Sequence, residues 1–236
     1  MSKTTSELRA LLRARADAAR IPGLQRFFKT APGQYADGDV FIGVTVPQVR
    51  AVCRERGRVE LTDAVELLRS PVHEERLLAL LLMVEAFRRS SPAEQREIHA
   101  QYLASTAFIN NWDLVDSSAH QIVGAWLQDR SRLPLRRLAR SVSIWERRIA
   151  MIATFHYIKR GEFDETFRIA DVLLADTHDL IHKAVGWMLR EVGNRDPAAE
   201  RRFLKDRYGR MPRTMLRYAI EKFPERERRR YLKGTV

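Results

Sequence analysis

Helix-start and helix-stop signals recur along the whole chain, and they constrain the fold more than any other feature. Thr45 stands two residues before Pro47, and Gly57 follows as a stop signal. Ser91 and Glu94 have the spacing of a capping box. No stretch alternates apolar and polar residues between hairpin turns. The sequence therefore predicts about a dozen helices, mostly of roughly 10–18 residues, and no sheet.

The same signals predict where individual helices begin and end. We expect Thr5 or Ser6 to cap the first helix. We expect Ser70 to cap the helix that contains the apolar run 77–84, which is apolar on nearly every side and so should be buried. A continuous helix is expected over residues 144–160.

Short connections between the predicted helices favour antiparallel pairs. Successive pairs along one chain form an α-solenoid, and a repeat of roughly 35–45 residues is close to HEAT-like spacing. We expect an all-α fold and a single HEAT-like helical repeat domain over residues 1–236. Its concave surface should form a basic groove able to follow a duplex backbone.

The charge of the chain favours a polyanionic partner. The formal net charge is +12, and arginine supplies most of the 42 basic residues. Arginine binds phosphate through two parallel hydrogen bonds, so nucleic acid is the leading inference. An arginine-rich source genome is the alternative explanation of this composition.

Several other classes of protein are disfavoured. The single cysteine, Cys53, excludes an intrachain disulfide and a cysteine-based metal site. Residues 1–20 lack the apolar core of a signal peptide, and no run approaches transmembrane length. We therefore expect a cytoplasmic protein with no membrane contact. His178 and His182 lie four residues apart with no third ligand evident, so we expect structural or solvent-facing roles and no metal.

The stretch Asn111-Trp112-Asp113-Leu114-Val115-Asp116 is the leading site candidate. On a helix, Trp112 and Asp116 share one face a turn apart, whereas Asp113 lies about 100° away. An aromatic surface beside a carboxylate suits a cationic group. The alternative is that Trp112 is a core aromatic and Asp116 a surface or capping acid.

Two further stretches carry a tryptophan beside a basic or small residue. Arg148 follows Trp145 by three residues and has the reach to grip a phosphate, unless it belongs to a solvated helix start. Gly186 lies within a predicted helix, where it indicates the close approach of another backbone or a ligand. Trp187 beside it is a second aromatic candidate, or a residue packed between helices.

Together these stretches resemble the AlkD family of HEAT-repeat DNA glycosylases, the DNA alkylation repair proteins. The resemblance covers roughly residues 20–225 and rests on four motifs in the family's order. They are Phe41-Ile42-Gly43-Val44-x-x-Pro47, Trp112-Asp113-Leu114-Val115-Asp116, Ile144-Trp145-x-x-Arg148 and Lys183-Ala184-Val185-Gly186-Trp187-Met188-Leu189-Arg190-Glu191.

The resemblance implies an enzyme that removes N3- and N7-alkylated purines from double-stranded DNA without metal or cofactor, as a monomer. The implied catalytic residues are Asp116, Trp112 and Trp187. The implied DNA-binding residues are Arg148, Phe27, Arg190 and Lys183. The family often has tyrosine in the N-terminal helix at the place of Phe27, so any contact made through that hydroxyl is missing here.

Two other functions remain open from the sequence. One is a non-catalytic HEAT protein that binds bent, branched or damaged DNA, and the other is a helical scaffold for proteins. A pure DNA binder has no need of the set Trp112, Asp116, Arg148 and Trp187. A scaffold should show no affinity for DNA at low salt, because phosphate contacts release counterions.

Overall fold

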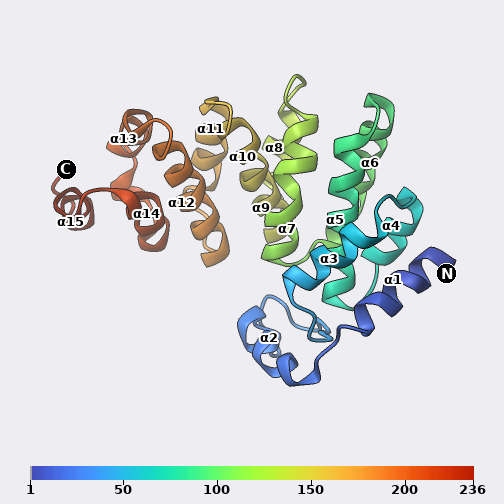
Figure 1. The fold of residues 1–236 in the computed structure, drawn as a ribbon. Helices are drawn as coiled ribbons and strands as arrows, with labels where there is room; N and C mark the ends of the chain where they lie inside the picture. The colour runs from blue at the N-terminus through green and yellow to red at the C-terminus, as the bar shows by residue number, and fades with distance from the viewer. Residues whose placement is uncertain (1) are drawn as a thin grey trace. The chain divides into compact units, whose positions relative to one another are not determined.

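The computed structural model describes residues 2–236, and its regular structure is helical (Figure 1). Within that range the only β-type pairing is an isolated parallel bridge between Val40 and Val72. The prediction of an all-α fold is therefore confirmed. Contacts divide the chain into two compact units, Met1–Ser118 and Ala119–Val236. The prediction of a single repeat domain stays a prediction.

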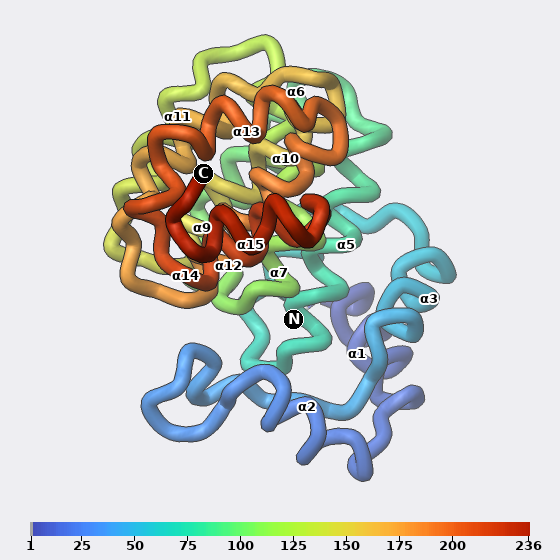
Figure 2. Tube along the Cα trace, turned by 90° about the vertical axis from the view of Figure 1, so that its left-hand side faces the viewer, coloured from blue at the N-terminus to red at the C-terminus, as the bar shows by residue number. Residues whose placement is uncertain are grey.

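Unit 1 contains the N-terminal helices and a long irregular segment after the second of them. A short 3₁₀ turn, Ala18–Arg20, precedes that second helix. The helices are α1 (Lys3–Arg13), α2 (Ile21–Phe28), α3 (Val46–Arg56), α4 (Leu61–Leu68), α5 (His73–Arg89), α6 (Pro92–Ala104) and α7 (Trp112–Ala119), the last of which ends one residue past the unit. In both ribbon and tube views α1, α3 and α5 lie beside one another (Figures 1 and 2).

Unit 2 begins with a π-helical turn, His120–Gly124, that continues directly from α7. Such turns are uncommon, and they occur often near functional sites. The helices that follow are α8 (Leu133–Leu138), α9 (Ile144–Ala153), α10 (Phe155–Ile158), α11 (Asp164–Leu173), α12 (Asp179–Gly193), α13 (Pro197–Lys205), α14 (Arg213–Ala219) and α15 (Glu225–Lys233).

Within each unit, the helices pack on elements that lie one to three places away along the chain, a local packing consistent with an α-solenoid. In unit 1, α5 contacts α1, α3, α4 and α6, and the predicted apolar run 77–84 is buried throughout. In unit 2, α12 contacts α9, α11, α13 and α14. Those two helices form the centres of the two cores.

Two of the predicted helix starts are wrong. Ser2, not Thr5 or Ser6, caps α1, and its hydroxyl accepts the Thr5 amide proton at 3.0 Å. Ser70 bonds the amide of Val72 at 3.1 Å, and α5 begins only at His73. The Ser-Pro signal was outweighed because Val40 and Val72 pair there, which holds the chain extended before the helix starts. Thr45 caps α3 as predicted and forms a capping box with Gln48, and the predicted capping box at Ser91 also forms.

The predicted continuous helix over residues 144–160 is also wrong. It consists of α9 and α10, with a break at Thr154. The Thr154 hydroxyl donates to the Met151 carbonyl at 2.7 Å, a local bond that competes with the helical ladder. Gly124 lies against this break, since a Cβ there would stand 2.2 Å from the Ala153 carbonyl oxygen.

Glu200, in the first turn of α13, is a buried acid whose carboxyl group occupies the space beside Gly193. It is 2 % exposed, and its Oε1 has no hydrogen-bond partner among residues 2–236. Burial raises the pKa of Glu200 from 4.5 to about 8, although the charge of Arg201 opposes the change. At neutral pH this carboxyl group is therefore protonated.

We expect Glu200→Gln to stabilise the protein at alkaline pH. Because the folded-state pKa is raised, the wild type loses stability as pH rises from about 4.5 to about 8, whereas glutamine does not titrate. Urea unfolding should show a gain of about 1–3 kcal/mol at pH 9 that shrinks toward pH 5. Glu97→Gln, at an exposed position, is the matched control. An equal gain for both variants at pH 9 would contradict the assignment.

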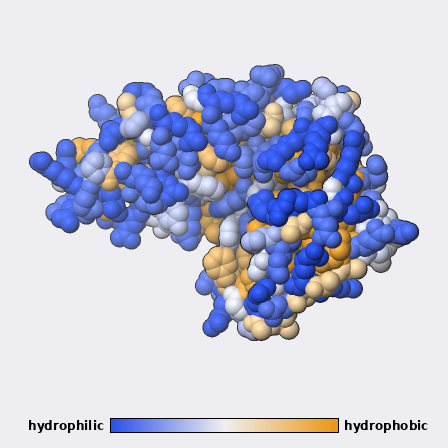
Figure 3. Space-filling view, viewed as in Figure 1, coloured by the Kyte–Doolittle hydropathy of each residue, from blue (hydrophilic) through white to orange (hydrophobic). Residues whose placement is uncertain are grey.

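No helix in the described part of the chain is both long and apolar enough to cross a bilayer. The face shown in Figure 3 is mostly hydrophilic, and hydrophobic side chains reach it in the lower part of unit 1, around α2. One contributor to the exposed apolar surface of α2 is Phe27, which is 62 % exposed.

Candidate active site

The helix α7 has one buried and one accessible face. Leu114, Val115 and Ser118 are buried, whereas Trp112 and Asp116 remain partly accessible. This is the face that the four-residue spacing predicted. The aromatic ring and the carboxylate therefore lie one turn apart on the side of α7 that solvent reaches.

Trp112 is the outer ring of an aromatic stack. Its ring is parallel to Phe28, with centroids 5.3 Å apart and planes at 15°, and Phe28 in turn stacks on Phe41 at 5.1 Å. Phe27 meets the edge of Trp112 at 5.6 Å and 76°. The stack holds Trp112 from one side, and the exposed Phe27 extends the aromatic surface outward from it.

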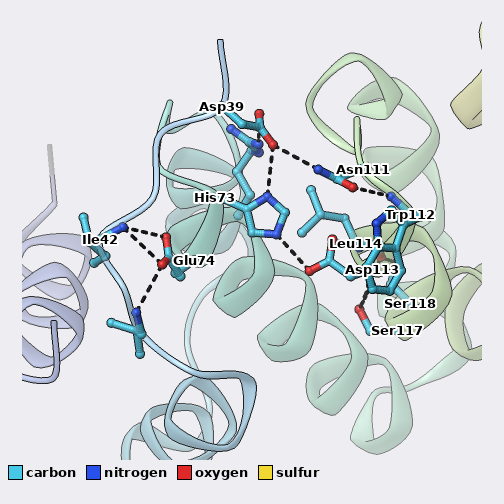
Figure 4. A network of polar contacts seen from close by, with 12 residues as sticks. Asp39, Ile42, His73, Glu74, Asn111, Trp112, Asp113, Leu114, Ser117 and Ser118 are labelled. Atoms are coloured by element: carbon cyan, nitrogen blue, oxygen red, sulfur yellow. Dashed lines mark hydrogen bonds and ion pairs between the residues drawn. The ribbon is translucent and has the colours of Figure 1, made fainter. Parts of the chain in front are cut away.

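Asp113, the neighbouring acid, is held in a buried polar network (Figure 4). Its Oδ2 lies 2.8 Å from His73 Nε2, and its Oδ1 accepts the Leu114 amide proton at 2.9 Å. His73 Nδ1 lies 3.1 Å from Asp39 Oδ2, and Asp39 Oδ1 accepts from Arg76 at 2.6 Å. Asn111 donates to Asp39 at 3.2 Å and accepts the Trp112 amide proton at 2.8 Å.

The network contains two acids, two cations and the side-chain amide of Asn111. Burial alone would lower the pKa of His73, but the charge and hydrogen bond of Asp113, together with the hydrogen bond of Asp39, raise it to about 9. Burial would likewise raise the pKa of Asp39, and the hydrogen bond from His73 with the charge of Arg76 holds it below its usual value. At neutral pH His73 is therefore an imidazolium that donates from both nitrogens.

These contacts assign different roles to the two acids of α7. Both oxygens of Asp113 accept hydrogen bonds, and the charge of His73 offsets its own. Asp113 is therefore structural, as predicted from its position on the helix. Asp116 is the acid that shares the accessible face with Trp112.

The segment 41–44 is held in place by Glu74. This buried carboxylate accepts the amide protons of Ile42, Gly43 and Val44 at 2.9–3.2 Å. Gly43 has φ +83°, and a Cβ there would stand 2.0 Å from the Asp17 carbonyl oxygen, so glycine is required. The Phe-Ile-Gly-Val motif is thus fixed as an irregular segment, from which Phe41 joins the aromatic stack.

In unit 2, Trp187 lies on α12 beside a second aromatic group. Its centroid is 6.1 Å from that of Phe155, and its indole nitrogen donates to Glu191 at 3.3 Å. Lys159 and Arg195 place their charges over the Phe155 ring at 4.3 and 5.7 Å. Trp187 is half-buried, whereas Trp145 is buried. Trp187 also lies next to the ring, Phe155, over which the two cations are placed.

The predicted DNA-binding residues of unit 2 occupy different surroundings. Arg148 is buried, and its Nη1 donates to the Leu180 carbonyl at 2.6 Å, which ties α9 to the first turn of α12. Lys183 pairs with Asp179 at 2.7 Å, and Arg190 pairs with Glu221. Their contacts with DNA stay predictions.

The two histidines that were compared with a metal pair make structural bonds. His178 accepts the Leu180 amide proton at 3.1 Å, and His182 Nε2 lies 2.5 Å from the Asp176 carbonyl oxygen. Both bonds hold the start of α12. The spacing of four residues thus reflects the beginning of a helix.

The sequence of residues 8–223 matches the family that is described as "DNA alkylation repair enzyme". The chain belongs to this family. No curated protein matches it. Membership assigns this alkylation repair protein a role in the repair of alkylated DNA.

Two solved structures resemble this alkylation repair protein in fold. One is described as a predicted DNA alkylation repair enzyme from Enterococcus faecalis. It is 16 % identical with a TM-score of 0.69, and the match covers 89 % of this chain and 98 % of that one. The other is the crystal structure of smu.31 from Streptococcus mutans, also 16 % identical with a TM-score of 0.53, and that match covers 99 % and 98 %. At this identity the likeness concerns the fold.

Sequence reasoning missed the polar network of this alkylation repair protein. Asp39 and His73 are 34 residues apart, and no local pattern joins them. The available signal was the beginning of α5, where His73, Glu74, Glu75 and Arg76 are four consecutive ionisable residues that the helix buries. Buried charges need partners, so such a run indicates contacts with other elements.

Proposed function

We propose that the protein is a monofunctional DNA glycosylase that releases N3- and N7-alkylated purines from duplex DNA. The observation that carries the proposal is the accessible face of α7, where Trp112 and Asp116 lie together while Asp113 is engaged elsewhere. Family membership supports a role in alkylation repair, and the chemistry is argued below from the residues.

An N3- or N7-alkylated purine carries a positive charge, which makes it a good leaving group. When its C1′–N9 bond breaks, the electron pair leaves with the base, and positive charge develops on the deoxyribose. The Asp116 carboxylate stabilises that charge, and the Trp112 ring offers its π face to it. Water, oriented by Asp116, then attacks C1′ and loses a proton to that carboxylate, which passes it to solvent, and an abasic site remains.

Residues of unit 2 are proposed to act on the same DNA. Trp187 would offer a second aromatic face to the cationic nucleotide. Arg148 would hold the backbone by exchanging its bond to the Leu180 carbonyl for a phosphate. Lys183 and Arg190 would exchange their carboxylate partners for phosphate. The protein would act in the cytoplasm, at the nucleoid, as a monomer with no obligate protein partner and no cofactor.

The direct test is incubation with duplex DNA that contains 7-methylguanine, followed by measurement of the free base by mass spectrometry. We expect release of the base and an abasic site without strand cleavage. Unmethylated duplex is the control. Tight binding to methylated DNA without release would favour the non-catalytic DNA-binding protein instead, and no affinity for DNA at low salt would favour a protein scaffold.

We expect Phe27→Ala to slow base release with little effect on stability. Phe27 is 62 % exposed and touches Trp112 by its edge, so its removal costs little core packing but frees the outer ring of the stack. An aromatic pair contributes about 0.5–1.5 kcal/mol, which corresponds to a change of roughly 2–10-fold in rate. Single-turnover kinetics measures it. Val46→Ala, which removes another exposed apolar side chain of unit 1, is the control, and an equal effect of both would contradict the role of Phe27.

A further inference from the structure

We propose that His73 is a positioning residue, which holds the N-terminal turn of α7 so that Trp112 and Asp116 face the substrate. The inference rests on the proposed function. It adds a residue that contacts neither the DNA nor the attacking water. His73 lies on α5 and is 2 % exposed, so it acts only through its neighbours.

The imidazole of His73 joins three separate elements. Its two nitrogens contact carboxylates on two of them, Asp39 in the segment between α2 and α3 and Asp113 on α7 (Figure 4). A ring with one donating nitrogen would satisfy only one of these carboxylates. The doubly protonated ring bonds both and therefore sets the distance from α7 to the 39–44 segment.

The flat faces of the ring also contact the aromatic stack. His73 is stacked on Phe41 at 4.6 Å and 23°, and its centroid is 4.8 Å from that of Phe28. Phe28 is the ring on which Trp112 stacks. His73 thus reaches Trp112 by two routes, through the carboxylate of Asp113 and through the ring of Phe28.

The amides at the start of α7 complete the argument. The first helical amides of any helix lack partners within the helix. Here those of Trp112 and Leu114 are bonded by Asn111 and Asp113, and both of these side chains belong to the network around His73. The network therefore sets the orientation of the turn that carries Trp112, and Asp116 follows one turn later.

Three elements place charges beside His73, whereas α2 packs on it through the uncharged ring of Phe28. The charges are Asp39 from the preceding segment, Asp113 from α7 and Arg76 from its own helix. When His73 loses its second proton, one carboxylate faces a nitrogen lone pair instead of a proton. The position of α7 should then loosen as pH rises through about 9.

The experiment compares His73→Phe with wild type on duplex DNA that contains 7-methylguanine. Phenylalanine keeps a ring in the stack and removes both donors. We expect the single-turnover rate to fall by about 10–100-fold, because small displacements of reacting groups cost that much. The dissociation constant for the same DNA should change by less than about threefold, because DNA contacts elsewhere are untouched.

Glu75→Gln is the matched control. Glu75 is the next buried acid of α5, and it pairs with Arg9 of α1 at 2.8 Å instead of with α7. Its loss removes a comparable buried charge pair without reaching Trp112. We expect this variant to retain a rate close to that of wild type even where its melting temperature is lower.

Two further measurements separate positioning from general stability. In hydrogen–deuterium exchange, peptides over residues 108–118 should exchange faster in His73→Phe, with those of α12 unchanged. The ratio of the wild-type rate to the variant rate, in which titration of the substrate cancels, should fall as pH rises through about 9. Asp113→Asn, which keeps the acceptor for Leu114 but not the charge, should show a smaller loss of rate, and it replaces His73→Phe if that variant does not fold.

The outcomes are distinct. The inference about His73 is overturned if the wild type releases base and both His73→Phe and Asp113→Asn match it in three measurements. These are the single-turnover rate, the exchange of residues 108–118 and the pH dependence of the rate. If the loss of rate in Glu75→Gln equals that in His73→Phe, the effect is one of stability and the inference is again overturned. If the wild type releases no base, the proposed function fails, while exchange at residues 108–118 still decides whether His73 holds α7.

Discussion

Asp116→Asn is expected to abolish most release of 7-methylguanine, with a fall in single-turnover rate of about 100–1,000-fold. Asparagine has nearly the shape of aspartate but no negative charge, so it leaves α7 intact and removes the stabilisation of the positive sugar. Asp116 lies on the accessible face of α7, and asparagine keeps its size there, so the packing of α7 should be retained.

Binding and stability distinguish this loss from a loss of structure. The affinity for DNA should be unchanged or tighter, because a negative charge near the phosphates has been removed. The melting temperature should remain close to that of wild type. Asp129→Asn, at an exposed position of unit 2, is the matched control and should keep the full rate. If Asp116→Asn releases base at the wild-type rate, the assignment of Asp116 as catalytic is wrong.

Gly186→Ala is expected to destabilise the protein by about 1–3 kcal/mol, although alanine is the better helix former. Gly186 lies within α12, and a Cβ there would stand 2.4 Å from the Met215 carbonyl oxygen and 2.5 Å from the Cβ of Tyr218. The first of these atoms is backbone of α14, which cannot rotate away. One of the two helices must move.

Gly209→Ala is the control in the same unit, because no atom lies within 4 Å of a Cβ built at Gly209. It should leave the free energy of unfolding unchanged within about 0.5 kcal/mol. Urea unfolding followed by circular dichroism measures both variants. Equal stability of the two would show that α12 and α14 separate without cost. Because Trp187 follows Gly186 directly, base release by Gly186→Ala should also fall.

Much of the fold was predictable because helix signals are local. The capping box at Ser91 bonds residues three positions apart, so the sequence spacing is enough to locate it, and Pro47 located the cap at Thr45. The burial of residues 77–84 was predictable because that helical run has no polar side. The close approach of another backbone to Gly186 was predictable because glycine is unfavourable within a helix. The break at Thr154 and the late start of α5 were not predictable, because competing bonds decided them.

For the candidate site, the sequence by itself determined that Trp112 and Asp116 share a face, because helical periodicity depends only on spacing. It also determined that Asp113 points elsewhere. Only the tertiary structure decided what Asp113 does, because its partner His73 lies 40 residues away on α5. It likewise decided that Arg148 is buried against Leu180. The physical reason is that burial creates the need for these partners: a buried charge must be matched, and which group matches it depends on how distant helices pack.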